Sequence, residues 1–196
     1  MTAVATGKDG LPIVGFSDAD AMTAWLERHH AQPAGIWLKI SKKGSPVASV
    51  TYSDAVDVAL CHGWIDGTKM SLDASAYLQK FTPRRARSIW SKVNIARVAK
   101  LVAAGRMHAA GSREVERAQA DGRWAQAYDS HRTATVPPDL QRCLDRNKAA
   151  TAFFATLSSA NRYAILWRIQ TAKKPETRAK RIATIMRMLR NKETFH

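Results

Sequence analysis

The stretch Gly35-Ile36-Trp37-Leu38-Lys39-Ile40 decides the fold class, because apolar and polar residues alternate along it and several of the apolar ones are β-branched or aromatic. This pattern is typical of a β-strand with one buried face. Before it, Ser17-Asp18-Ala19-Asp20 supplies an N-cap and first-turn acids for a helix that continues to about His30. The chain therefore begins by combining helix and strand.

Further elements follow in the same half of the chain. The predicted elements are a strand over 47–52, a helix that Ser53-Asp54 caps and Gly63 ends, and strands over 64–72 and 77–82. This order predicts a small antiparallel sheet with helices on one face.

The second half has the pattern of a helical protein. Helices are predicted at about 89–104, 109–120, 123–129, 138–146, 148–156, 159–173 and 176–190, with Gly and Pro residues between them. The fold class is therefore α+β: a small antiparallel sheet with helices in the N-terminal half, followed by an all-helical C-terminal half. We expect two parts, residues 1–82 and residues 83–196, with the second packed against the first.

Charge is distributed unevenly along the 196 residues. The chain has 31 Lys or Arg against 16 Asp or Glu, a formal net charge of +15. Residues 1–80 hold 7 basic and 8 acidic residues, whereas residues 81–196 hold 24 and 8. Such asymmetry indicates either an anionic partner or a set of solvated helix surfaces.

Composition and targeting signals place the chain in a broad class. Apolar residues make up 45% and charged residues 24%, which excludes a disordered or collagen-like chain. No apolar run approaches the roughly 18 to 20 residues of a transmembrane helix, and the start has no secretory signal pattern. Two cysteines are too few for a disulfide framework. We therefore expect a cytoplasmic protein.

Two neighbouring segments carry the residues that are best suited to bind a ligand. On the predicted strand, Trp64 and Asp66 face the same side. Arg84 and Arg87 precede a helix whose free N–H groups favour anions, and Asn94 shares that helix's inner face with Trp90. We expect a pocket at the seam of the two halves that binds a small anionic ligand. Its predicted lining is Trp64, Asp66, Arg84, Arg87, Trp90 and Asn94.

Two other interpretations stay open at this point. The arginine-rich loop could instead hold the two halves together through ion pairs with Asp66 and Asp73. The basic helical half could bind nucleic acid or another anionic surface without sequence preference, in a weak and salt-sensitive way.

Two further arginines fall on apolar helix stripes. Arg162 lies between Leu166 and Ile169, and Arg178 lies on the stripe of the last helix. An arginine in such a position needs a carboxylate, carbonyl groups or a bound anion.

No catalytic residue can be assigned from the pattern. Cys61 and His62 are adjacent, and adjacent residues on a helix do not face each other. The six histidines show no zinc spacing, and the chain has neither a glycine-rich phosphate loop nor a dinucleotide fingerprint. We expect no metal and no cofactor, and the pattern does not predict an oligomeric state.

Several longer motifs carry a family resemblance. They are Leu60-Cys61-His62-Gly63-Trp64-Ile65-Asp66-Gly67, Phe81-Thr82-Pro83-Arg84-Arg85, Ser88 to Asn94, Asp121-Gly122-Arg123-Trp124, Asn161-Arg162-Tyr163-Ala164 and Ala172 to Arg178. With these motifs the chain resembles the YdeI/OmpD-associated family from about Phe16 to His196. The resemblance implies a bacterial protein of a family labelled bacteriocin protection, and it carries no catalytic residue over to this chain.

Overall fold

The computed structural model describes residues 5–196, which form two compact units. The first unit runs to Ile89 and resumes over Asn94–Ala125, and the second consists of Trp90–Val93 and Gln126–His196. The predicted parts are 1–82 and 83–196, whereas in the structure residues 83–89 and 94–125 belong to the first unit.

The first unit is built on a four-stranded sheet in the order β1-β2-β4-β3. Its strands are β1 (Ile13–Gly15), β2 (Ile36–Ser41), β3 (Trp64–Ser71) and β4 (Ala76–Pro83). β2 and β3 both pair with β4 in antiparallel register, and β1 runs parallel to β2. The sheet is therefore mixed, and the prediction of a purely antiparallel sheet is wrong in this one strand.

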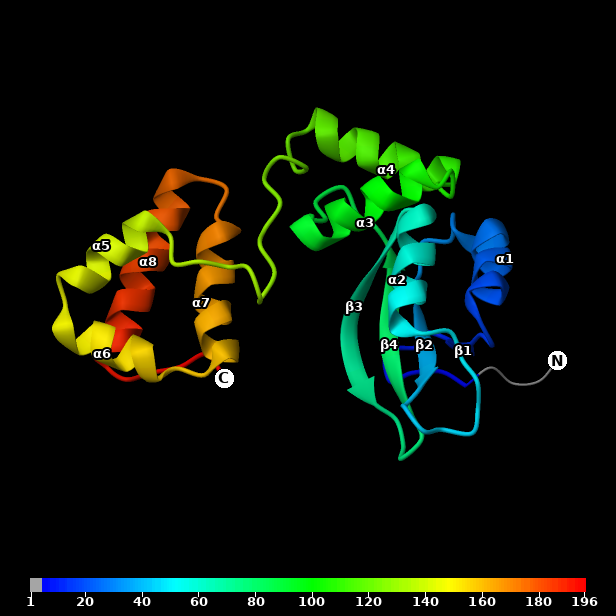
Figure 1. Cartoon of the computed structure of the whole chain (residues 1–196), viewed down its shortest axis with the longest axis horizontal. Helices are drawn as coiled ribbons and strands as arrows, with labels where there is room; N and C mark the ends of the chain where they lie inside the picture. The colour runs from blue at the N-terminus through cyan, green and yellow to red at the C-terminus, as the bar shows by residue number, and fades with distance from the viewer. Residues whose placement is uncertain (1–4) are drawn as a thin grey trace. The chain divides into compact units, whose positions relative to one another are not determined.

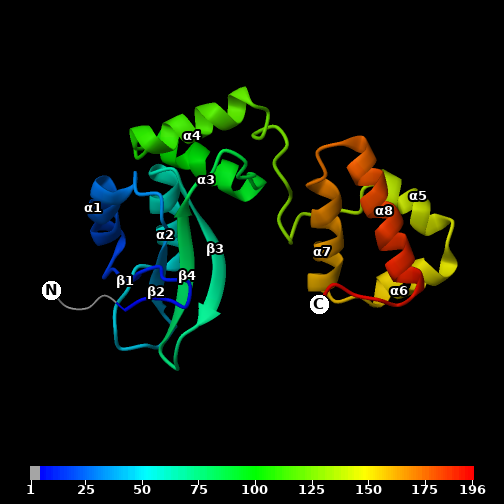
Figure 2. The ribbon, with the colours of Figure 1, turned by 180° about the vertical axis from the view of Figure 1, so that it is seen from behind.

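Two helices, α1 (Ala19–His29) and α2 (Tyr52–Cys61), pack with the sheet, and Figures 1 and 2 show α2 lying along it. Both helices begin at a side-chain cap: Asp18 accepts from the Ala21 amide, and Thr51 accepts from the Asp54 amide. Met22 and Leu26 of α1 are fully buried, as is Trp64 of β3. The core of this unit therefore lies between the sheet and these helices.

The helices α3 (Lys92–Ala103) and α4 (Ala109–Ala120) follow the sheet. The start of α4 lies against the end of α2, where the His108 amide donates to the Cys61 carbonyl at 3.1 Å. Gly111 makes this approach possible, because a Cβ there would overlap the same carbonyl. Gly63, with φ of +76°, ends α2 and turns the chain into β3.

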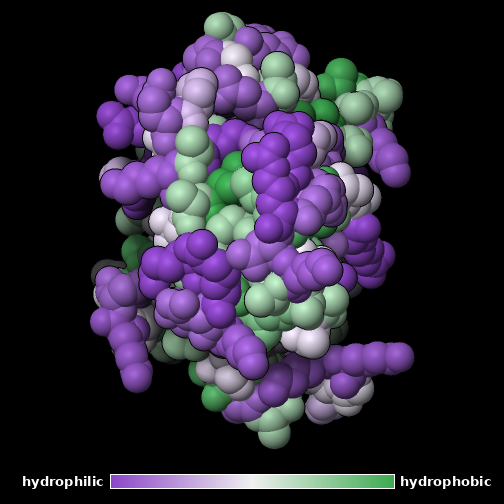
Figure 3. Space-filling model, turned by 90° about the vertical axis from the view of Figure 1, so that its left-hand side faces the viewer, coloured by the Kyte–Doolittle hydropathy of each residue, from purple (hydrophilic) through white to green (hydrophobic). Residues whose placement is uncertain are grey.

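The second unit contains α5 (Pro138–Asp145), α6 (Lys148–Thr156), α7 (Ser159–Gln170) and α8 (Pro175–Arg190). α5 and α8 begin with a proline, where the missing N–H removes no helical hydrogen bond. The buried faces of all four helices form one apolar cluster that includes Leu140, Ile169 and Ile185. Figure 3 shows one face of the molecule, on which hydrophilic side chains cover most of the surface, with hydrophobic patches between them.

Two predicted elements are wrong. Residues 47–51 form no strand. A neighbouring strand would have accepted a hydrogen bond from the Ser41 amide through its backbone, but this amide donates to the Ser49 hydroxyl instead. Residues 123–126 form turns and residues 127–129 are irregular, so no helix forms there. The Asp121 carboxylate accepts a hydrogen bond from the Arg123 amide at 3.1 Å, which holds the backbone in a turn. The α+β class and the helical C-terminal half are confirmed.

None of the helices between residues 5 and 196 is long and apolar enough to cross a membrane.

Candidate anion-binding site

The candidate site begins where β4 ends. The Arg84 amide donates to the Gly63 carbonyl at 2.9 Å, which ties the end of β4 to the turn before β3. The next residues form a tight turn, in which the Arg85 amide donates to the Ser88 hydroxyl and the Ser88 amide donates to the Arg85 carbonyl, both at 2.9 Å. Hydrogen bonds to Gly63 and within the turn therefore hold the backbone from 84 to 88.

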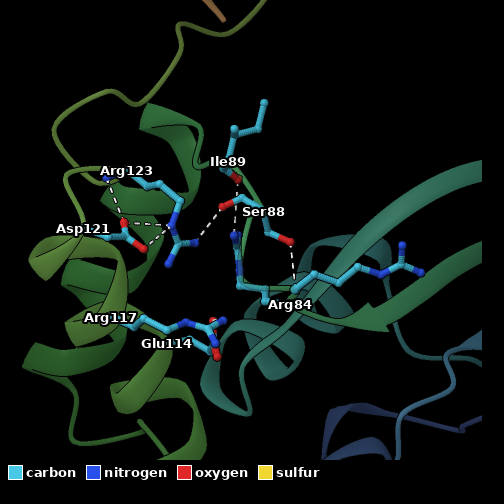
Figure 4. Close-up of polar contacts among 8 residues, drawn as sticks. Arg84, Ser88, Ile89, Glu114, Arg117, Asp121 and Arg123 are labelled. Carbon is cyan, nitrogen blue, oxygen red and sulfur yellow. Dashed lines mark hydrogen bonds and ion pairs between the residues drawn. The ribbon is translucent and has the colours of Figure 1, made fainter. Parts of the chain in front are cut away.

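Two buried arginines donate hydrogen bonds to the backbone of this loop (Figure 4). Arg84 is 6% exposed and Arg123 is 5% exposed. Nη1 of Arg84 donates to the Ile89 carbonyl at 3.3 Å, and Nη1 of Arg123 donates to the Ser88 carbonyl at 2.8 Å. Two guanidinium groups thus hold consecutive carbonyls of the loop, although the arginines are 39 positions apart in the sequence.

Arg123 is also paired with an acid. Its Nε donates to both carboxylate oxygens of Asp121, at 2.8 and 2.7 Å. Desolvation acts against the charge of Asp121, but the hydrogen bonds from Arg123 outweigh it and lower the pKa of this carboxyl. Nη2 of Arg123 is buried and has no hydrogen-bond partner among residues 5–196. The arginine therefore keeps one unused donor inside the fold.

An open groove with a volume of about 430 Å³ adjoins the start of the loop. Three basic residues line it, Lys80, Arg84 and Arg85, against one acid, Asp9. The remaining walls are Leu11, Pro33, Ala34, Gly35, Thr82 and Pro83.

Asp9 is tied to one of these bases. Its carboxylate accepts from Lys80 Nζ at 2.7 Å and from the Trp37 indole N–H at 2.8 Å. These two hydrogen bonds, that from Lys80 first, lower the pKa of Asp9 to about 2. The carboxylate therefore stays charged at neutral pH, and the groove retains an excess of positive charge.

The structure assigns different surroundings to the six residues predicted to bind a ligand. Trp64 is fully buried, and its indole N–H donates to the His30 carbonyl at 2.9 Å, which makes it a core residue. Asp66 is half-buried and accepts from the Tyr52 hydroxyl at 2.6 Å. Arg87 is exposed on the turn, Trp90 is buried and Asn94 is half-buried. Of the six, Arg84 alone lines the groove.

Sequence reasoning missed three residues of this region: Lys80, Asp9 and Arg123. Lys80 lies on the strand just before the arginine-rich loop, so its proximity was visible in the sequence. Asp9 lies 71 positions from Lys80, and no local pattern predicts their contact. Arg123 belongs to the motif Asp121-Gly122-Arg123-Trp124, which carries the family resemblance but has no spacing that indicates a binding site.

A cluster of three histidines, also missed, lies where α1, α2 and α4 meet. The rings of His30 and His108 are 4.7 Å apart between centroids, and those of His62 and His108 are 5.0 Å apart. Burial first, and then the neighbouring His108 and His30, lower the pKa of His62, although its hydrogen bond to the Val58 carbonyl acts against this. Within residues 5–196, no group of three or more His, Cys, Asp or Glu side chains is placed to hold a metal ion.

Comparison with known proteins divides the chain in a similar way. Residues 14–114 match a family model described as a domain of unknown function, DUF8412. Residues 133–192 match the model described as bacteriocin-protection, YdeI or OmpD-associated. No curated protein and no solved structure matches the chain. The predicted family is thus confirmed over the helices α5–α8, a shorter range than the resemblance suggested. The chain belongs to the DUF8412 family through more than half of its length, and its residues 133–192 match the YdeI/OmpD-associated family model.

Proposed function

We propose that the first unit binds a small anion in the groove beside the end of β4. The observation that carries the proposal is the groove's lining, in which Lys80, Arg84 and Arg85 outnumber the single acid Asp9. An anion in the groove would gain hydrogen bonds from donors that are charged, and such bonds are about twice as strong as neutral ones.

The surroundings of the groove favour a preformed site. Arg84 is held by the Ile89 carbonyl, and the adjoining turn is closed by Ser88. Arg85 is exposed and its side chain can turn toward a ligand. Lys80 is shared with Asp9, so a bound anion would compete with that carboxylate for the ammonium group. We therefore expect modest affinity, with Arg85 as the main contact.

The test uses inorganic phosphate and citrate as probes in calorimetric titrations of the full chain. Arg85→Ala should weaken binding of the better probe by about tenfold, which corresponds to about 1.4 kcal/mol. Arg87→Ala is the matched control, because Arg87 lies on the same exposed turn but does not line the groove. Equal losses in both variants would contradict the groove.

The same titration also tests one of the other predicted contacts, Arg87. The groove proposal does not use Trp64, Asp66, Arg87, Trp90 or Asn94, because none of them lines the groove. If Arg87→Ala abolishes binding and Arg85→Ala does not, the arginine-rich loop binds the anion through its outer side.

A second candidate function is sequence-independent binding of nucleic acid by the second unit. This unit has 15 Lys or Arg against 5 Asp or Glu. Six of its basic side chains are exposed on or beside α8, namely Lys173, Lys174, Lys180, Arg187, Arg190 and Lys192. Binding of this kind falls steeply with salt. A mobility shift with DNA and RNA at two salt concentrations tests it, and no shift at low salt would exclude it.

We also propose a cytoplasmic location, which the two free cysteines support, Cys61 buried and Cys143 half-buried. Cell fractionation tests the location. A role in bacteriocin protection, which is part of the family description, is a proposal that a deletion strain would test through its sensitivity to bacteriocins.

A further inference from the structure

The second unit has a hollow of its own, with a volume of about 240 Å³, at the start of α7. One side of it is polar, with Ser159, Arg162 and Tyr163 from α7 and His131 from the preceding loop. The other side is apolar, with Ala134, Leu157 and Leu166. No Asp or Glu lines it, so the charge of Arg162 dominates the hollow.

Arg162 is held in place by neutral groups. Its Nη2 donates to the Ala155 carbonyl at 3.0 Å and to the Leu157 carbonyl at 3.4 Å, both near the end of α6. The guanidinium carbon lies 5.4 Å from the centre of the Phe154 ring. These contacts fix the direction of the side chain without neutralising it.

The charge of Arg162 is not balanced within the described chain. No carboxylate of residues 5–196 forms an ion pair with it. Its Nε is buried and has no hydrogen-bond partner in the same range. A guanidinium beside apolar side chains is stabilised when an anion pairs with it. By contrast Arg178, the other arginine on an apolar stripe, is paired with Asp139 at 2.6 Å.

The neighbouring side chains offer further contacts to an anion. His131 is exposed, and its ring lies edge-on to that of Tyr163 with centroids 5.5 Å apart. The Tyr163 hydroxyl already donates to the Asp129 carbonyl at 3.0 Å. This bond fixes the position of the Tyr163 ring, and the hydroxyl proton is not available to a ligand. The Ser159 hydroxyl is exposed and can donate. One fixed cation and two adjustable donors therefore face the same hollow.

We propose that this hollow binds a small carboxylic acid with an apolar body. One guanidinium matches one carboxylate in charge and in planar shape. The apolar wall of Ala134, Leu157 and Leu166 would cover the hydrocarbon part. A volume of about 240 Å³ is below the roughly 300 to 1,000 Å³ of sites for drug-sized ligands, which limits the ligand to about the size of benzoate.

Benzoate and its neutral isostere benzamide test the charge requirement. Both are titrated into the ¹⁵N-labelled full chain and followed by NMR. Benzoate should shift the amides around Arg162 and Tyr163 and bind at least about tenfold more tightly than benzamide. The proposal is overturned if benzamide binds as tightly, or if benzoate on the order of 10 mM causes no shift at these amides. Tighter binding of phenyl phosphate than of benzoate would overturn the choice of a carboxylate.

Two matched substitutions test the location. Ser159→Tyr should fill the hollow and weaken benzoate binding about tenfold, and Ala160→Tyr is its control, because both residues are exposed in the first turn of α7 but only Ser159 lines the hollow. Arg162→Gln should abolish the preference for benzoate over benzamide. An unchanged preference in Arg162→Gln, or equal binding by the two tyrosine variants, would refute the site. This hollow lies within the second unit, so a negative result here says nothing against the anion site proposed for the groove of the first unit.

Discussion

Gly111→Ala gives the sharpest test of the way in which α4 is attached to α2. The added Cβ would overlap the Cys61 carbonyl oxygen, and it would lie 2.7 Å from both the Cys61 carbonyl carbon and the Leu60 carbonyl oxygen. All three atoms belong to the backbone at the end of α2, so no side chain can turn aside. The helix α4 must move away instead.

The cost can be worked out from three contributions. Overpacking of this kind costs about 1–3 kcal/mol. The movement also weakens the hydrogen bond from the His108 amide to the Cys61 carbonyl, which is worth about 1 kcal/mol. Alanine recovers about 1 kcal/mol through its higher helix propensity. We therefore expect a net loss of about 1–3 kcal/mol in the free energy of unfolding.

Urea denaturation followed by far-ultraviolet circular dichroism measures this loss as a lower midpoint at an unchanged slope. Gly15→Ala is the matched control, because a Cβ there meets nothing within 4 Å. The control should stay within about 0.5 kcal/mol of the parent chain. If Gly111→Ala is as stable as Gly15→Ala, the close contact between α4 and α2 does not exist as described.

Three further outcomes follow from the charged groups. Arg178→Ala should lower the free energy of unfolding by about 1–3 kcal/mol in the urea assay, because the half-buried ion pair with Asp139 and the hydrogen bond to the Ile169 carbonyl are lost. Arg187→Ala is the control, because its ion pair with Glu193 is more exposed, and it should change the free energy of unfolding by less than about 0.5 kcal/mol. The pKa of His62 is lower in the folded protein than in the unfolded chain, where it is near 6.5. The stability that neutral His62 contributes is therefore complete above about pH 6.5 and is lost as the pH falls below that value. His62→Gln should flatten this decline in thermal melts from about pH 7.5 to 5, and an equally steep decline would contradict the argument from burial. Lys80→Ala should raise the pKa of Asp9 from about 2 toward 3.8, which carboxyl ¹³C titration can measure, and an unchanged value would show that the Trp37 bond suffices.

The sequence predicted those elements whose own residues decide their structure. β2 is rich in β-branched and aromatic residues, and α8 has a proline at its start and an apolar stripe along it, so both were predicted close to their observed bounds. β1 was missed because three residues are too few for any period, and it pairs in parallel with a strand more than twenty positions away. The helix expected at 123–129 failed because one carboxylate, that of Asp121, holds the backbone in a turn.

The candidate site was predictable only in its local part. Arg84 stood out because it lies in an arginine-rich turn after a strand, and it does line the groove. Its neighbours there include Asp9 and Pro33, which the sheet brings close from distant parts of the sequence. Arg123 reaches the Ser88 carbonyl across 35 positions, and no periodicity encodes such a contact. Pairings between distant segments thus account for what sequence reasoning missed.

The short segment Trp90–Val93 has a consequence for dissecting the protein. It belongs to the second unit although the chain on both sides of it belongs to the first, and it is joined to Tyr128 by two backbone hydrogen bonds of 3.0 and 2.9 Å and through Lys92 to Asp129 at 2.7 Å. The polypeptide consequently passes between the units three times. A fragment that starts at residue 126 would lack a piece of its own fold, whereas a chain cleaved once at 125/126 would still carry, on its N-terminal product, a tether for the C-terminal one. Cleavage of the intact protein is therefore a better way to separate the two units than expression of each unit from its own gene fragment.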